Sequence, residues 1–198
     1  MGVIFQSLGR TITAGVVLLL VILGLVAATS TTPTGIGSHA WGAFFVRWLH
    51  VLCGIMWVGL LWYFNFVQTP SMAKIPDVEK PAVTKVIAPM ALFWFRHAAL
   101  WTVITGLTLS TMGGSIGALF TFARPNTAIA IGMWFALIMA FNVWFIIWPN
   151  QKRALGLVAA EPDVRARSAR IAGMVSRLNT MFSIPMLYCM VAQQHGGM

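Results

Sequence analysis

The chain contains 198 residues, of which 59% are hydrophobic and 9% are charged, whereas soluble domains carry about 25% charged residues. This composition excludes a soluble globular domain and predicts an integral membrane protein. Lys and Arg outnumber Asp and Glu by 13 to 4, which in a membrane protein indicates orientation in the bilayer rather than nucleic-acid binding. The two cysteines, Cys53 and Cys189, lie within apolar runs, so they predict no disulfide framework.

Five apolar stretches predict an all-α bundle of about five transmembrane helices in a single domain, residues 1–198. The first stretch follows Arg10 and resembles the hydrophobic region of a signal peptide. Its roughly eighteen residues are long enough to cross a bilayer, so we interpret it as a retained first span. Cleavage of this stretch would leave four spans in the same orientation. The predicted spans cover about residues 11–29, 41–68, 91–112, 127–148 and 171–191.

Two connecting segments carry helix signals of their own. Residues 70–88 hold prolines and charged residues, and Asp77 is a good N-cap, so a short surface helix is predicted to begin there. Pro162 and Asp163 are typical of the first turn of a helix. The helix that follows is predicted to run unbroken into the fifth span, with a kink at Pro185.

Positive charges fall almost entirely on one side of the predicted bundle. With five spans, only Arg124 lies in a loop on the opposite side. This asymmetry follows the positive-inside rule, so it predicts a cytoplasmic N-terminus and a periplasmic C-terminus. The basic helix at residues 163–170 is expected to contact anionic lipid rather than nucleic acid. The residues on the basic side are Arg10, Lys74, Lys80, Lys85, Lys152, Arg153, Arg165, Arg167, Arg170 and Arg177.

The second span gathers its polar side chains on one face. At 100° per residue, the members of this stripe fall within about 80° of one another around a helix. A membrane helix that places all its ionisable and amide side chains on one stripe turns that stripe toward a protein interior. The stripe consists of Arg47, His50, Gly54, Trp57, Leu61, Asn65 and Gln68.

The third span places His97 on a face with aromatic and hydroxyl side chains, so a second histidine also points inward. Two histidines on adjacent helices are the minimum for bis-imidazole ligation of haem b, and we predict His50 and His97 as the ligands of the haem iron. Arg47 and Arg96 would then anchor the haem propionates or a substrate. An offset of about 10 Å between the two histidines would require tilted or shifted helices.

The histidines also have a simpler interpretation, in which each makes one interhelical hydrogen bond and binds nothing. Met186 and Met190 share a face of the fifth span and are alternative ligands, although methionines at this spacing more often serve packing. His39 and His195 both fall on the outer side, where the absence of carboxylates argues against a metal site.

A second group of polar residues gathers at the predicted cytoplasmic ends of three spans. These side chains either form interhelical hydrogen bonds, worth roughly 0.6 kcal/mol each, or line a pocket for a polar ring or a quinone head. On the fourth span, Gly132, Ala136 and Ala140 form a stripe of small residues that predicts a helix-packing seam. The predicted polar pocket consists of Asn65, Gln68, Asn142, Arg177 and Asn179, with Asn150 and Thr180 beside it.

Four segments resemble the membrane domain of the bacterial cytochrome c-linked urate hydroxylases, the urate oxidase N-terminal family. They read WLHVLCGIMWVGLLWYFNFVQTP, FWFRHAALWTVITGL, FNVWFIIWPNQKR and SRLNTMFSIPML, and they cover four of the five predicted spans. The resemblance implies a multi-pass oxidoreductase domain of the bacterial inner membrane that passes electrons to a C-terminally fused cytochrome c domain. The sequence itself contains no CxxCH motif for a covalently attached c-type haem. A fainter similarity reaches the membrane protoporphyrinogen oxidases.

These observations predict a membrane redox protein that binds haem b and serves electron transfer or substrate oxidation within a larger membrane complex. Other membrane subunits and a cytochrome c are the expected partners. Two alternatives stay open at this point. One is a non-catalytic subunit that stabilises a respiratory or oxygenase complex, and the other is an enzyme that oxidises urate with a separate cytochrome c.

Overall fold

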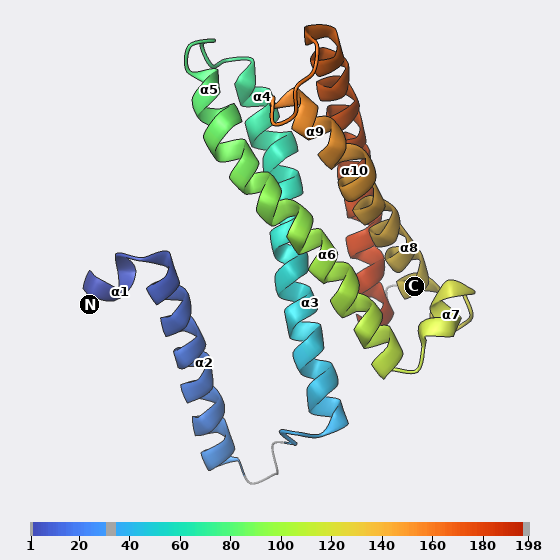
Figure 1. Cartoon of the computed structure of the whole chain (residues 1–198). Coiled ribbons are helices and arrows are strands. Elements are labelled where there is room, and N and C mark those ends of the chain that lie inside the picture. The colour runs from blue at the N-terminus through green and yellow to red at the C-terminus, as the bar shows by residue number, and fades with distance from the viewer. Residues whose placement is uncertain (1, 31–34, 196–198) are drawn as a thin grey trace. The chain divides into compact units, whose positions relative to one another are not determined.

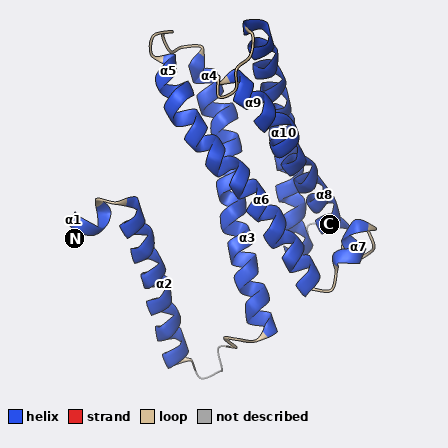
Figure 2. Cartoon of the chain, viewed as in Figure 1, coloured by secondary structure: helices blue, strands red, loops and turns tan. Residues whose placement is uncertain are grey.

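The computed structural model describes residues 2–30 and 35–195, and all regular secondary structure in these ranges is helical (Figures 1 and 2), which confirms the all-α class. The chain divides into two units, Met1–Gly42 and Ala43–Met198. Among the described residues, four helices are long and apolar enough to cross a membrane. They are Leu8–Thr29, His39–Met72, Lys80–Met112 and Thr127–Ala154.

The N-terminal unit consists mainly of one apolar helix. A short helix α1 (Gly2–Phe5) precedes α2 (Leu8–Thr29), which covers the predicted first span and begins three residues before it. Within this unit, none of the α2 side chains is buried. The helix is predominantly apolar, and its 22 residues are enough to cross a membrane.

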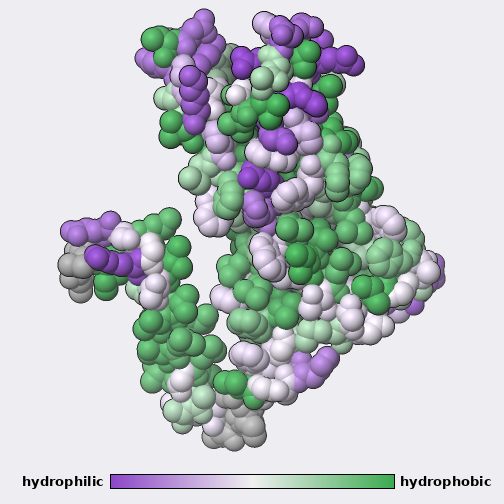
Figure 3. All heavy atoms as spheres, viewed as in Figure 1, coloured by the Kyte–Doolittle hydropathy of each residue, from purple (hydrophilic) through white to green (hydrophobic). Residues whose placement is uncertain are grey.

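The C-terminal unit is built from four long helical segments that run along one another (Figure 1). In chain order they are α3 (His39–Trp62), η1 (Tyr63–Gln68) and α4 (Thr69–Met72); α5 (Lys80–Ala82), η2 (Val83–Ile87) and α6 (Ala88–Met112); α8 (Thr127–Phe141), η3 (Asn142–Ile147) and α9 (Trp148–Ala154); and α10 (Pro162–His195). A short helix, α7 (Ile116–Phe120), connects α6 to α8. The connections at 73–79 and 155–161 lie at the same end of this unit, and Figure 3 shows hydrophilic side chains gathered there.

Three of the four segments contain a π-helical stretch, and each stretch stops one residue before an X-Pro pair. The stretches η1, η2 and η3 are followed by Thr69-Pro70, Ala88-Pro89 and Trp148-Pro149. Proline has no N–H and its ring clashes with the carbonyl one turn back, so a wider turn before it lets the helix continue. The prolines therefore do not end these helices.

The prediction of a separate surface helix that begins at Asp77 is wrong. The segment that begins with α3 continues through Met72, and residues 73–79 are not helical, Asp77 included. The next helix begins at Lys80 with Glu79 as its N-cap residue, and it runs without interruption into α6.

The long helix after Pro162 is confirmed. It spans Pro162–His195 and contains Pro185 in its interior. Its N-terminal half carries arginines at 165, 167, 170 and 177, and α10 is not among the four helices that are apolar enough to cross a membrane. The fifth span therefore stays a prediction.

The predicted seam of small residues is confirmed between α8 and α10. Gly132 lies so close to α10 that a Cβ atom there would be 3.1 Å from the Cβ of Cys189 and 3.3 Å from the carbonyl oxygen of Met186. Ala136 and Ala140 are buried on the same helix. The core of the unit is filled by large side chains from all four segments, including Trp57, Leu61, Phe95, Met139 and Met186.

Candidate functional site

The imidazole of His50 is held between α3 and α6. Its Nδ1 lies 2.9 Å from the carbonyl oxygen of Thr102 and 3.1 Å from Oγ1 of Thr105. Gly106 provides the space, because a Cβ atom at that position would lie 2.9 Å from Cε1 of the ring. The fit fixes both the position and the orientation of the imidazole.

The partners of His50 also determine its tautomer. A carbonyl oxygen can only accept, and Oγ1 of Thr105 donates its proton to the carbonyl of Trp101 at 2.6 Å. Nδ1 of neutral His50 must therefore carry the proton, and Nε2 keeps its lone pair. Histidines that bind a metal are commonly oriented by such a bond from the other ring nitrogen to a backbone carbonyl.

His97 has the same tautomer in different surroundings. Its Nδ1 lies 2.7 Å from the carbonyl oxygen of Phe93, one turn earlier on α6. The ring lies against that of Phe93, with centroids 4.3 Å apart and planes tilted by 37°, and it meets Trp144 of η3 edge to face at 5.8 Å. Arg96 is adjacent, and its carbonyl accepts a hydrogen bond of 3.1 Å from Nε1 of Trp144.

The structure does not bring the two histidines together. His50 contacts α6 at Thr102, Thr105 and Gly106, whereas His97 lies about 140° around that helix from Thr102 and roughly 7.5 Å away along its axis. A single haem ligated by both would have to pass through α6, so these residues do not fit joint ligation within this chain. The binding of haem itself stays a prediction.

The remaining residues of the haem prediction also lie apart. The side chain of Arg47 is exposed on α3. Met186 belongs to the buried core, and the Cε methyl of Met190 packs near Gly132, so both methionines serve helix packing. His39 and His195 are exposed.

The predicted polar cluster separates into two parts. In the first part, Nδ2 of Asn142 donates to Oδ1 of Asn179 at 2.8 Å, and Nδ2 of Asn179 donates to the carbonyl of Met139 at 3.0 Å. Asn142 is 6% exposed and Asn179 is fully buried. These two amides connect η3 to α10 as interhelical hydrogen bonds.

The second part lines a cavity of about 280 Å³ at the cationic end of the C-terminal unit. All three π-helical segments border it, together with α10. The side chains of Phe64 and Phe95, which pack edge to face at 5.6 Å, form an apolar wall. Its polar lining comes from Asn65, Gln68, Thr69, Thr84, Gln151, Ser176 and Arg177.

Hydrogen bonding in this lining is incomplete. Nδ2 of Asn65 donates to the carbonyl of Leu61 at 2.9 Å and to Oγ of Ser176 at 2.8 Å, which fixes the amide across the helix interface. Oε1 of Gln68 is shielded from solvent and accepts no hydrogen bond. A buried acceptor without a donor is unfavourable, and among the described residues of this lining it occurs at Gln68 alone.

Sequence reasoning identified Asn65, Gln68 and Arg177 of this lining and missed Thr84, Gln151 and Ser176. The first three stand out as polar side chains within or next to apolar spans. Thr84 lies in the predicted surface helix and Gln151 lies beyond the predicted end of the fourth span, because the prolines at 89 and 149 concealed the continuing helices. The X-Pro pairs themselves were the available signal.

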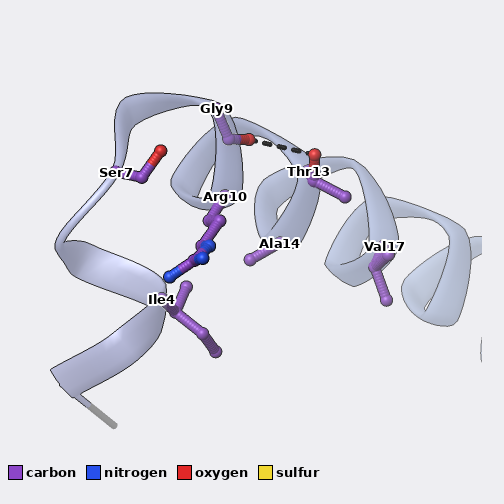
Figure 4. A pocket seen from close by; sticks show the side chains of 7 residues that line it. All are labelled: Ile4, Ser7, Gly9, Arg10, Thr13, Ala14 and Val17. Carbon is purple, nitrogen blue, oxygen red and sulfur yellow. Dashed lines mark hydrogen bonds between the residues drawn. The ribbon is translucent and has the colours of Figure 1, made fainter.

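A larger hollow of about 570 Å³ lies beside α2 in the N-terminal unit (Figure 4). Ile4, Ser7, Ala14 and Val17 contribute to its lining, and Thr13 donates to the carbonyl of Gly9 at 2.9 Å. Figure 4 shows the Arg10 side chain extending toward Ile4. Because this surface is open and mostly apolar, we place the candidate site in the cavity of the C-terminal unit.

Comparison with known proteins identifies a family for the C-terminal part of the chain. A family model described as urate oxidase N-terminal matches residues 111–198, which comprise α7, α8, η3, α9 and α10. No curated protein and no solved structure matches the chain. Two of the four motifs that suggested the resemblance, FNVWFIIWPNQKR and SRLNTMFSIPML, lie inside the matched range. The predicted resemblance to the urate oxidase N-terminal family is thus confirmed over residues 111–198, where the family model matches.

Proposed function

We propose that the chain is the membrane component of an oxidoreductase and that its cavity binds a small planar heterocycle with N–H donors and carbonyl acceptors. An oxopurine such as urate has this chemistry. The proposal rests on the cavity between η1, α6, η3 and α10 and on the family of residues 111–198. Pockets for small molecules are typically apolar with a few convergent polar groups, and this lining follows that pattern.

The observation that carries the proposal is the unsatisfied Oε1 of Gln68. It requires a donor, and the ring N–H of an oxopurine supplies one. Arg177 is the cationic group of the lining, and a guanidinium suits a carbonyl oxygen or an anionic ring. Phe64 and Phe95 offer an aromatic surface for the flat face of the ligand.

A quinone head is the alternative occupant, since it is also planar and polar. The oxidised quinone ring has carbonyl acceptors and no N–H, so it leaves Oε1 of Gln68 without a donor. The hydrogen-bonding requirement therefore favours the heterocycle.

Binding measurements on the purified protein in lipid nanodiscs test this assignment. We expect isothermal titration calorimetry to detect urate binding, and Gln68→Leu to weaken it about tenfold through the loss of one hydrogen bond. Asn150→Leu is the matched control, because Asn150 lies at the same end of the unit but bonds only the carbonyl of Ile146 and does not line the cavity. Equal affinities for the parent protein and Gln68→Leu would contradict the assignment, and binding of a quinone in place of urate would favour the alternative.

For the histidines, we propose that one of them at most would hold a haem iron, through its Nε2. Haem would supply one-electron transfer to the complex. We expect a Soret band in the purified protein that changes in one of the two variants His50→Ala and His97→Ala and not in the other. Loss of the band in both would restore joint ligation, and a protein without a Soret band would leave a subunit that binds no haem.

We also propose that the chain resides in the bacterial inner membrane with its cationic end in the cytoplasm, in a complex with other membrane subunits and a cytochrome c. The connections at 73–79 and 155–161 lie at this end, and the cations on the helix ends that flank them, such as Lys80, Lys152 and Arg153, support this orientation. In intact cells, an impermeant thiol reagent should label a cysteine introduced by Ser38→Cys and should not label one introduced by Ala160→Cys. The reverse pattern would invert the orientation.

A further inference from the structure

Arg96 lies in an aromatic environment on the surface between α6 and the η3–α9 segment. Its guanidinium carbon is 3.9 Å from the centre of the Trp148 ring and 5.3 Å from that of Phe93. This arrangement holds the cation by its face, and the Arg96 side chain as a whole is half-buried.

The charge of Arg96 has no counter-ion among the described residues. Its NH1 nitrogen is shielded from solvent and makes no hydrogen bond. The described ion pair of the chain joins Lys80 to Asp77, in the connection before α5, and no described carboxylate pairs with Arg96. An uncompensated charge at an apolar helix surface is unfavourable, so an anion from outside the chain would stabilise it.

A second cation approaches the same indole. Nζ of Lys152 lies 5.6 Å from the centre of the Trp148 ring, so Arg96 and Lys152 are both held at one side chain. Lys152 is one turn further along α9, toward the cationic end of the unit. Tryptophan with lysine and arginine nearby is characteristic of the level of the lipid headgroups.

We propose that Arg96, Trp148 and Lys152 form a binding site for the phosphate group of an anionic phospholipid. Two cations suit a headgroup with a net negative charge, and a guanidinium suits two phosphate oxygens at once. The surface below Arg96 fits the acyl chains, because Leu100 and Ile104 follow one and two turns deeper on α6 and are 38% and 40% exposed. This apolar continuation favours a lipid over a free phosphate ion.

Native mass spectrometry of the detergent-purified chain tests the site. The protein is titrated with phosphatidylglycerol and with phosphatidylcholine of the same acyl chains. We expect tighter retention of phosphatidylglycerol by the parent protein, and about tenfold weaker retention by Arg96→Gln, as for the loss of one charge-assisted hydrogen bond. Lys152→Gln should also weaken the retention of phosphatidylglycerol. Because this variant keeps the Arg96–Trp148 contact, it tests the site even if Arg96→Gln does not fold.

Arg153→Gln is the matched control, since Arg153 is exposed, neighbours Lys152 on α9 and makes no described contact with Trp148. It removes the same charge from the same helix and should leave lipid retention unchanged. Inorganic phosphate at millimolar concentration, added to the lipid-bound protein, tests whether the site binds a free phosphate ion rather than a phospholipid. Unchanged retention in Arg96→Gln and Lys152→Gln, equal loss in Arg153→Gln, or displacement of the lipid by inorganic phosphate would overturn the proposal.

Discussion

Two pairs of amide side chains in the C-terminal unit have the same chemistry and different surroundings. Asn142 and Asn179 bond each other and a backbone carbonyl, and both are buried. Asn65 and Gln68 lie beside a cavity, and Oε1 of Gln68 has no donor. The difference shows that the polarity of a membrane-helix residue does not reveal its role. What distinguishes the pairs is whether the protein satisfies all of their hydrogen bonds.

The buried pair depends on the close approach of α8 to α10, so the largest expected effect comes from separating these helices. We expect Gly132→Leu to lower the free energy of unfolding by about 1–3 kcal/mol or more, because its Cβ meets Cys189 at 3.1 Å and the Met186 carbonyl at 3.3 Å. Thermal unfolding in detergent measures the loss. Gly59→Leu is the control, since a Cβ there meets nothing within 4 Å. Equal stability of the two variants would show that the seam is not tightly packed.

Removing one member of the buried pair should have a somewhat smaller effect. Asn179→Leu leaves the Nδ2 group of Asn142 without its acceptor, and we expect a loss of about 1–2 kcal/mol in unfolding free energy. The double variant Asn142→Leu/Asn179→Leu should recover part of this loss, because it removes the unpaired group as well. Full additivity of the two single substitutions would contradict a direct bond between them.

Substitutions of Asn65 and Gln68, beside the cavity, should affect ligand binding more than stability. Asn65→Leu removes the bond to Ser176 and should cost only roughly 0.6 kcal/mol of stability, while it weakens ligand binding by disturbing the lining. Thermal unfolding in detergent measures the loss of stability, and isothermal titration calorimetry measures the loss of ligand affinity. A stability loss as large as that of Asn179→Leu would make the two amide pairs equivalent and remove the basis of the comparison.

The smallest effect is expected outside both pairs, at the exposed Lys80–Asp77 ion pair. The hydrogen bond of 2.6 Å from Lys80 lowers the pKa of Asp77 from its ordinary value. Because the pKa is lower in the folded state, this contribution is complete above the unfolded pKa of about 3.9 and is lost as the pH falls through the folded pKa. Lys80→Gln should raise the pKa of Asp77, as measured by carboxylate NMR, without changing ligand affinity. A change in affinity would connect this loop to the cavity.

Much of this organisation could be predicted from sequence. Apolar runs of bilayer length predicted the long helices, and the spacing of Gly132, Ala136 and Ala140 predicted the α8–α10 seam, because helix periodicity is a local property. The polar pocket was predicted for the same reason, and of its members Asn65, Gln68 and Arg177 line the cavity. Asn142 and Asn179, predicted to belong to the same pocket, bond each other instead.

The features that could not be predicted from the sequence depend on how the helices pack against one another. His50 and His97 each lie on a polar face, but only the packing of α3, α6 and η3 decides that these faces point to different neighbours. The helix limits near Pro70, Pro89 and Pro149 were mispredicted because π-helical turns absorbed the prolines. The X-Pro pairs mark where the π-helical turns occur, whereas the different neighbours of the two histidines have no local sequence signal.

Protection of a cysteine in the cavity tests the central claim most directly. Ser176 lines the cavity and bonds Asn65, so Ser176→Cys, with Cys53 and Cys189 replaced by alanine, places one thiol beside the proposed ligand. We expect urate to slow the labelling of this thiol by a small maleimide about twofold at a concentration equal to its dissociation constant and about tenfold at ten times that concentration, in the manner of a ligand that occupies the cavity. A thiol introduced by Ser110→Cys, at the far end of α6, should react at the same rate with and without urate. Equal labelling rates at Ser176→Cys with and without bound urate would contradict the assignment of this cavity as the ligand site.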